Sequence, residues 1–195
     1  MNITINHPTF NFHAAPALGR AFFAALMPTD EDPDTTAPAA AQAVAGPPQI
    51  GEYWEGQGGI YVGDFRSGAG SVYGLIVGAE EDIGRARWAP EGDMPNLTDW
   101  DGLANTAALV ESCPAAKLAA GYTRDEHSDF YLPARRELHL AAANVPDKFG
   151  KSSWYWSSTP YSGSYAWAVD FEDGYTHHFY RTSEFRVRPF RRFIY

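Results

Sequence analysis

The pattern of apolar and polar positions predicts strands, then helices, then strands again along the second part of the chain. Two β-rich runs, 58–65 and 71–78, flank the glycine-containing loop RSGAG, which is typical of a β-hairpin. Apolar residues alternate with small or polar residues over 166–171, and the Asp-Gly pair that follows predicts a tight turn. Further strands are expected over 176–181 and over 185–193, where a proline marks a bulge or an edge position.

Helical patterns lie between the two groups of strands. Residues 101–122 are rich in alanine and leucine at helical spacing, and Pro114 in a first turn predicts two short helices or one kinked helix. Residues 132–145 predict a further helix that begins near Pro133 and ends at Pro146. Its apolar stripe consists of Leu138, Ala141, Ala142 and Val145. Strands, helices and then strands indicate an α+β domain.

The N-terminal part differs in pattern from the rest of the chain. Residues 30–49 are rich in Pro, Ala and Asp without an apolar period, which indicates a linker between residues 1–29 and a domain over 50–195. Residues 1–29 contain a short period-two pattern, and we expect them to dock on a partner or a neighbouring subunit, or to lie back on the domain. The apolar stretch 19–28 is short and has no basic leader, so we do not interpret it as a signal peptide.

Composition and charge narrow the classes of partner. The net charge of −9 argues against general nucleic-acid binding, which needs a basic surface. Residues 181–195 nevertheless hold five arginines and one acid; we expect these arginines to pair with acids elsewhere, and the alternative is an anion site. A single cysteine, Cys113, excludes an internal disulfide, and we expect it to be a small buried residue. No apolar run approaches the roughly 20 residues of a membrane helix, so we expect no membrane insertion.

Five segments occur in an order that carries a family resemblance: YWEGQGGIY, DGLANTAAL, FYLPARREL, YWSSTPYSGSYAWAVDFEDG and VRPFRRF. From about residue 48 to residue 195, the chain resembles the C-type-lectin-like domains of phage and prophage proteins. Those domains are related to the C-terminal domain of bacterial collagen-like adhesins. They are more distantly related to formylglycine-generating enzymes and to the tropism-determining tip proteins of some phages.

The resemblance implies a C-type-lectin-like fold, with two helices packed on small antiparallel sheets. One sheet joins the termini, and an irregular hairpin region has a surface that binds ligands. The resemblance also implies structural roles for Leu132, Pro133, Trp156 and Trp167. We therefore expect Trp156, Trp167 and Phe171 to be largely buried.

Residues 152–180 concentrate tryptophan and tyrosine among serine and glycine, with almost no aliphatic residues. We interpret the tryptophans, with Phe171, as core residues. Tyrosine with serine and glycine is typical of binding loops, because the phenol offers a large contact area at low entropic cost; the alternative is a turn whose tyrosines lean on the core. The resemblance places this loop and the segment 177–183 near a ligand-binding surface. The candidate ligand-binding residues are Tyr161, Ser162, Ser164, Tyr165, His177, Tyr180, Arg181 and Thr182.

Motifs for metal or catalytic chemistry are weak. Residues 125–129 supply three acids and a histidine, which indicate either a solvated acidic loop or a calcium site, and both interpretations stay open. His177 and His178 are neighbours on a predicted strand and point to opposite faces, so we expect no metal site there. Formylglycine-generating activity relies, by the resemblance, on paired cysteines, and this chain has one. Neither a nucleophile elbow nor a phosphate-binding loop occurs, so we expect no enzyme activity and no cofactor.

Together these patterns favour a non-enzymatic, tail-associated virion protein encoded by a phage or prophage. Its lectin-like domain would bind a host-surface glycan or protein, while residues 1–29 would attach to other virion proteins. The resemblance adds a homo-oligomer, with a trimer as one form, and multivalent display would raise avidity. The alternatives are a structural decoration or cementing protein of the particle, and a bacterial surface adhesin. An enzyme is the third hypothesis, and it predicts a pocket in which Asp170 or Asp173 is required.

Overall fold

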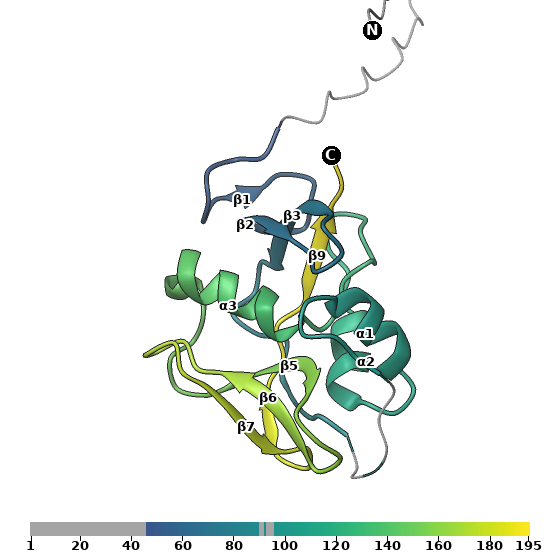
Figure 1. Cartoon of the computed structure of the whole chain (residues 1–195). Helices are drawn as coiled ribbons and strands as arrows, with labels where there is room; N and C mark the ends of the chain where they lie inside the picture. Colours follow the sequence, from purple (N-terminus) through teal and green to yellow (C-terminus); the bar gives the residue numbers. More distant parts are fainter. Residues whose placement is uncertain (1–45, 90–91, 93–95) are drawn as a thin grey trace, which may run out of the picture. The chain divides into compact units, whose positions relative to one another are not determined.

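The computed structural model describes residues 46–89, 92 and 96–195. The predictions for residues 1–29 and for most of the linker lie outside this part of the chain. The described residues form an α+β fold with three α-helices, one short 3₁₀-helix and two β-sheets (Figure 1). The expected fold class is therefore confirmed at this level.

The first sheet is antiparallel throughout and has the strand order β1-β2-β3-β9. The predicted hairpin is confirmed, because β2 and β3 pair along their length around the glycine-containing loop. A β-bulge falls between Tyr61 and Gly63, and Gly63 has φ +124°, which a side chain rarely tolerates. The first and last strands of the domain both belong to this sheet and form its two edges. The strands are β1 (Tyr53–Trp54), β2 (Gly59–Arg66), β3 (Val72–Gly78) and β9 (Phe190–Phe193).

The second sheet has the order β4-β8-β5-β6-β7, so β7 is an edge strand. One contact in it is parallel, between Tyr155 of β5 and Arg186 of β8, and the other pairings are antiparallel. The chain turns between β6 and β7 where the sequence predicts, with Gly174 at φ +76°, although residues 170–175 make a longer connection than a tight two-residue turn. The strands are β4 (Arg85–Arg87), β5 (Tyr155–Pro160), β6 (Tyr165–Val169), β7 (Thr176–Tyr180) and β8 (Glu184–Arg186).

Three helices occur where the resemblance implied two, because the alanine-rich stretch divides at Pro114. Pro114 is the first residue of α2, where its missing N–H costs nothing, and the Cys113 side chain caps that helix. Helix α3 contacts β2 on one side and β5 and β6 on the other, and Figure 1 shows it between the two sheets. The helices are α1 (Gly102–Leu109), α2 (Pro114–Ala120), α3 (Arg135–Asn144) and the 3₁₀-helix η1 (Pro146–Lys148).

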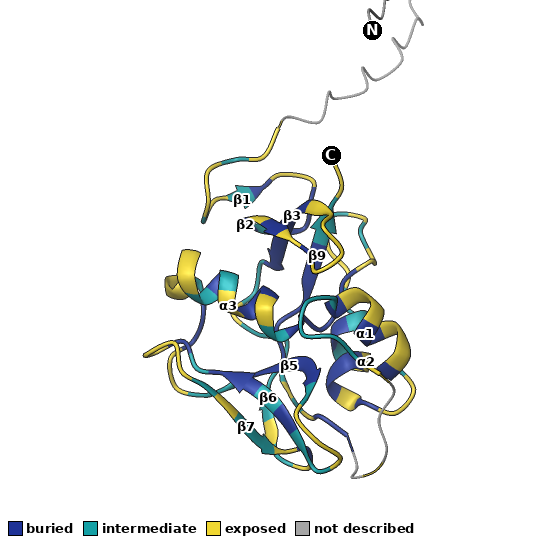
Figure 2. Cartoon of the chain, viewed as in Figure 1, coloured by how far each residue is buried: buried dark blue, intermediate teal, exposed yellow. Residues whose placement is uncertain are grey.

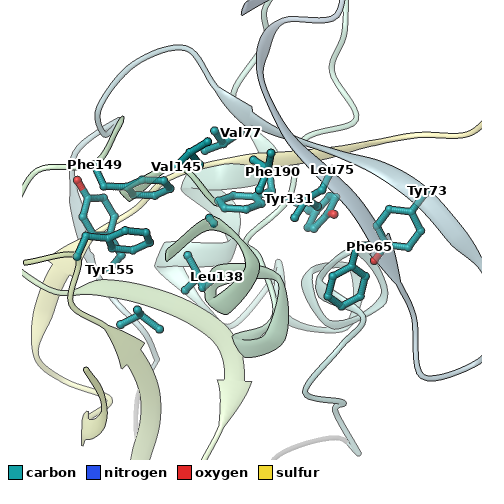
Figure 3. Packing of buried hydrophobic residues seen from close by; sticks show 14 residues of the cluster. Phe65, Tyr73, Leu75, Val77, Tyr131, Leu138, Val145, Phe149, Tyr155 and Phe190 are labelled. Carbon is teal, nitrogen blue, oxygen red and sulfur yellow. The ribbon is translucent and has the colours of Figure 1, made fainter. Parts of the chain in front are cut away.

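The core between the first sheet and α3 is largely aromatic. Figure 3 shows Phe149 and Tyr155 together at one end of this core, and Phe65 and Tyr73 together at the other. The rings of Phe149 and Phe171 stack with their centroids 3.7 Å apart. These rings fill the volume that leucine and isoleucine occupy in most cores, which explains part of the high aromatic content of the chain.

A second core forms where α1 and α2 cover the other side of the second sheet. Trp88 and Trp156 are fully buried in it, against alanines of α2 and of β6. The indole N–H of Trp88 donates to the carbonyl of Ser157 (2.6 Å), and that of Trp156 to the carbonyl of Ala86 (2.9 Å). Both large rings are thus buried without an unsatisfied donor.

Strand β5 separates the two cores, and this position explains its sequence. Tyr155 points into the first core and Trp156 into the second. The Ser157 hydroxyl then donates to the carbonyl of Trp167 (2.8 Å), and Thr159 donates to the carbonyl of Thr98 (3.1 Å). Small hydroxyl residues fit a strand that is covered on both faces, because they take little space and satisfy neighbouring backbone groups.

One burial prediction for this region is wrong. Trp156 and Phe171 are buried as expected, whereas Trp167 is only half-buried. On β6, Ala166 and Ala168 enter the second core, while Val169, on the same face as Trp167, enters the first core. Trp167 lies two residues further from the first core, under the guanidinium of Arg135, and is therefore only half-buried.

Candidate ligand-binding surface

The face of the β6–β7 hairpin on the α3 side carries a cluster of rings. Antiparallel pairing sets Tyr165 opposite Tyr180 and Trp167 opposite His178. The N–H of Arg181 donates to the carbonyl of Ser164, so these two residues form a hydrogen-bonded pair. Because hydrogen-bonded and non-hydrogen-bonded pairs alternate along an antiparallel ladder, both ring pairs occupy non-hydrogen-bonded positions. Side chains are closest in such pairs. Tyr161, in the loop between β5 and β6, adds a fifth ring to these two pairs. We call the five residues the aromatic face: Tyr161, Tyr165, Trp167, His178 and Tyr180.

The rings of the aromatic face support one another. Tyr161 stacks on His178 with centroids 4.0 Å apart and planes 10° apart. Trp167 meets both of these rings edge-on, at 5.1 Å and 5.5 Å. Tyr165 packs on Tyr180 at 4.6 Å. Each such contact contributes about 0.5–1.5 kcal/mol beyond area burial, so the cluster is ordered before any ligand arrives.

The aromatic face is open to solvent. Tyr161 is 53% exposed and Tyr180 is 55% exposed, while Tyr165, Trp167 and His178 are half-buried. Figure 2 shows β7 in the colours of intermediate and exposed residues, in contrast to the buried residues of β6 beside it. Large rings at a sheet edge with this exposure are uncommon unless they contact something.

Polar groups of α3 and the preceding loop border the aromatic face. The guanidinium of Arg135 lies over the Trp167 ring, 4.8 Å from its centroid, and donates to the Asp99 carboxylate (3.1 Å). Further along the hairpin, His139 Nε2 lies 2.7 Å from the hydroxyl of Thr176. Burial lowers the pKa of His139, and Arg135 lowers it further, so the imidazole is held neutral near pH 7.

A hollow of about 400 Å³ adjoins this border, between α3 and the turn that joins β6 to β7. Thr176 is one of its lining residues and shares a face of β7 with His178 and Tyr180. The hollow and the aromatic face are therefore neighbouring parts of one surface. The lining residues are His139, Ala142, Ala143, Gly174 and Thr176.

The structure brings only part of the predicted site together. Tyr161, Tyr165 and Tyr180 lie on the aromatic face, with Ser162 exposed and Ser164 half-buried in the adjoining loop. Two aromatic-face residues, Trp167 and His178, were missed by the sequence prediction. Alternation carried part of the signal, because Trp167 lies two residues from Tyr165 on β6 and His178 lies two residues from Tyr180 on β7, which puts each on the same strand face as its tyrosine.

His177 and Thr182 lie apart from the aromatic face. The His177 ring contacts Phe179 (5.0 Å between centroids) and Trp154 (6.4 Å), although it also stacks on the neighbouring His178. Thr182 lines a separate hollow of about 260 Å³ beside α2. The prediction of one recognition face for the whole set is therefore wrong for these two residues.

Arg181 is the clearest correction, because it is buried and not available for recognition. Only 3% of it is exposed, and its guanidinium lies 4.9 Å from the centre of the Trp88 ring. It donates to the carbonyls of Gly92 (3.0 Å) and Gly163 (2.5 Å). Arg181 therefore holds the loop that connects β5 to β6, and with it the position of Tyr161.

The other C-terminal arginines are also engaged within the domain. The expected pairing with distant acids is confirmed for Arg186, Arg191 and Arg192. Arg188 instead donates to backbone carbonyls, including that of Gly78. Burial lowers the pKa of Arg188 to about 10, which still leaves it charged at neutral pH.

The acidic loop is tied into the fold by its side chains. Asp125 accepts from the Tyr53 hydroxyl (2.7 Å) and from the N–H of Gly58 (3.2 Å), and Asp129 pairs with Arg191 (2.5 Å). Across the described residues, no three His, Cys, Asp or Glu side chains gather where they could hold a metal ion.

Burial raises the pKa of the Cys113 thiol to about 11, so this thiol is a poor nucleophile.

Comparison with known proteins adds no assignment. No family model matches the chain, and no curated protein matches it. Within the described part of the chain, the helices are too short or too polar to cross a membrane.

Proposed function

We propose that residues 50–195 form a C-type-lectin-like domain of a phage or prophage virion protein, and that its aromatic face contacts a host-surface glycan or protein. The observation that carries the proposal is the exposed cluster of stacked rings on the edge hairpin. The resemblance of residues 48–195 supplies the family. The function proposed is binding, without a catalytic step.

The aromatic face has the properties of a recognition surface. Tyr161 and Tyr180 expose large ring area, yet contacts with His178 and Tyr165 hold them in place. Binding through ordered rings loses little conformational entropy, which is why tyrosine is frequent in binding loops. Ser162 and Ser164 of the β5–β6 loop follow Tyr161 in the chain, and their hydroxyls can form hydrogen bonds to a partner, while Arg181 holds the loop backbone at Gly163.

Two features of the fold agree with a lectin-like domain. The first and last strands, β1 and β9, lie in one small sheet, and the proposed binding hairpin belongs to the other. We propose that residues 1–29 attach the domain to other virion proteins in a homo-oligomer, with a trimer as one form. Several copies would then contact the host surface at once, and avidity would compensate for a weak single site.

The test is binding of the full chain to host cells. Replacing Tyr161 or Tyr165 by alanine should reduce binding about tenfold or more, because each ring contributes area and stacking. Tyr175→Ala is the matched control, since Tyr175 is 67% exposed on the same hairpin but lies outside the aromatic face. Equal binding by all of these variants would remove the aromatic face as the contact surface.

A second candidate is a decoration or cementing protein, and a specific observation favours it. Val72, Ile194 and Tyr195 are exposed at the same end of the β3–β9 pair, which gives a contact surface away from the aromatic face. In an assembled particle this role predicts that a neighbouring subunit covers the aromatic rings. Protection of Tyr161 and Tyr180 from chemical labelling in particles, but not in the free protein, would favour it over host binding.

A further inference from the structure

We propose that the aromatic face binds a neutral polysaccharide by stacking sugar rings on Trp167 and Tyr161, with the Asp99–Arg135 pair contacting hydroxyl groups and no metal ion taking part. This inference rests on the proposed binding function and names the chemical class of the ligand.

The first step concerns the rings. The faces of a pyranose carry C–H groups with a small positive charge, and an aromatic ring presents a negatively charged face. Arg135 lies 4.8 Å above the centre of the Trp167 ring and covers part of that face, so a sugar would rest on the part of this half-buried ring that stays exposed and on Tyr161, which is 53% exposed. Tyr161 meets Trp167 at 84°, which gives two ring surfaces at an angle against which a sugar can rest.

The second step concerns the polar border. Sugar hydroxyls are both donors and acceptors, and they need partners of both kinds at the rim of a stacking surface. Asp99 supplies acceptor oxygens and Arg135 supplies N–H donors, and both side chains are partly exposed, at 38% and 28%. Thr176 and the neutral imidazole of His139 extend this polar border into the adjoining hollow.

The third step concerns charge. Asp99 and Arg135 are paired at 3.1 Å and neutralise each other beside Trp167. Arg181, which sequence analysis placed on this surface, is buried and bound to backbone carbonyls. The whole chain carries a net charge of −9, which repels anionic polymers. These observations favour an uncharged sugar over a sialylated or sulfated one.

The fourth step concerns shape. Tyr165 and Trp167 are two residues apart on one face of β6, and therefore roughly 6.5 Å apart along the strand. The aromatic face thus extends along the hairpin, and the hollow beside Thr176 continues in the same direction. An open, extended surface suits successive units of a chain better than a single enclosed sugar.

The experiment is affinity electrophoresis of the full chain through gels that contain dextran, mannan or hydroxyethyl cellulose. At least one neutral polymer should retard the wild-type protein, with or without EDTA. Trp167→Ala and Tyr161→Ala should weaken retardation about tenfold, because each removes a stacking surface. Tyr175→Ala should behave as the wild type, and Trp167→Phe keeps a ring at that position and should retain part of the binding.

The outcomes separate this inference from the function on which it rests. If no neutral polymer retards the protein while host cells still bind it and Tyr161→Ala still reduces that binding, the polysaccharide assignment is wrong and the binding function stands. Retardation by heparin or alginate alone, or retardation abolished by EDTA, would also overturn the assignment. If neither polymers nor cells bind, both proposals fail.

Discussion

Tyrosine and arginine side chains gather in two regions of the domain, and the regions differ in what covers them. Around Glu137, between α3 and the first sheet, Tyr73, Tyr131 and Arg192 are packed inside the protein. On the β6–β7 hairpin, similar rings lie at a sheet edge and contact mainly one another. The same residue types therefore stabilise the fold where a second layer closes over them, and stay partly exposed to solvent where none does.

The Glu137 cluster shows what the burial of a charged side chain requires. The carboxylate accepts from the hydroxyls of Tyr73 (2.7 Å) and Tyr131 (2.9 Å), from Arg192 (3.1 Å) and from the N–H of Ala134 (2.8 Å). Burial raises the pKa of Glu137, while Arg192 and these hydrogen bonds act in the opposite direction. A charged group is tolerated there because each oxygen has donors, a condition that an exposed cluster does not have to meet.

The largest effect should come from breaking this closed cluster. Arg192→Leu leaves Glu137 buried without its cation and should lower the free energy of unfolding by about 3–5 kcal/mol. The measurement is urea denaturation followed by circular dichroism. The control is Arg87→Leu, which breaks the Arg87–Glu184 pair, whose side chains are 64% and 60% exposed, and should cost less than about 1 kcal/mol. Similar losses in the two variants would mean that burial is not what makes the cluster stabilising.

A smaller loss is expected at Arg181, which connects the interior to the aromatic face. Arg181→Leu removes the donors to Gly92 and Gly163 and should cost about 1.5–3 kcal/mol. The β5–β6 loop should also become sensitive to limited proteolysis, and Tyr161 should lose its fixed position. Arg66→Leu serves as the control, because Arg66 is exposed and its one described bond, to Gly70, is long at 3.4 Å. An unchanged proteolysis pattern in the Arg181 variant would contradict its role in holding the loop.

Local patterns in the sequence predicted most elements of both regions. Pro114 marked the start of α2, Pro146 the end of α3, and Asp173-Gly174 the turn between β6 and β7. Each of these signals acts within a few residues, through a fixed φ angle or a missing donor, so no knowledge of the tertiary structure was needed.

What could not be predicted depends on distant partners. The carbonyls that bind Arg181 belong to Gly92 and Gly163, 89 and 18 positions away, and nothing near Arg181 indicates them. Trp167 was expected inside because of the family resemblance, yet it lies beyond the part of the first core that covers Val169 on the same face of β6. Alternation showed that β6 has two faces, but only the tertiary structure decides how far along the strand each core covers them.

The smallest substitution that compares the Glu137 cluster with the aromatic face removes one tyrosine hydroxyl from each. Tyr73→Phe leaves Glu137 without one donor in a buried site and should cost about 1–2 kcal/mol. Tyr161→Phe alters an exposed ring and should change the free energy of unfolding by less than about 0.5 kcal/mol. Denaturant midpoints of the two variants provide the measurement. A costly Tyr161→Phe would show that the phenol holds the hairpin together, which would weaken its assignment as a contact group.

The smallest effect should come from pH at the border of the aromatic face. Burial, with Arg135 and Arg136, lowers the pKa of His139 from its usual value near 6.5, and Asp99 acts against this shift. Between the folded and unfolded pKa values the unfolded chain binds more protons, so stability must rise with pH. The contribution is complete above about pH 6.5 and is lost as pH falls towards the folded pKa.

His139→Gln should remove this slope while keeping a donor and an acceptor near Thr176. Melting temperatures of both proteins between about pH 5 and pH 7.5 give the measurement, because the remaining titrating groups are shared and cancel in the difference. The wild type should gain stability relative to the variant as pH rises through this range. If the stability of the wild type relative to the variant does not rise with pH, burial does not lower the pKa of His139. In that case α3 does not close over this end of the hairpin as it closes over Glu137.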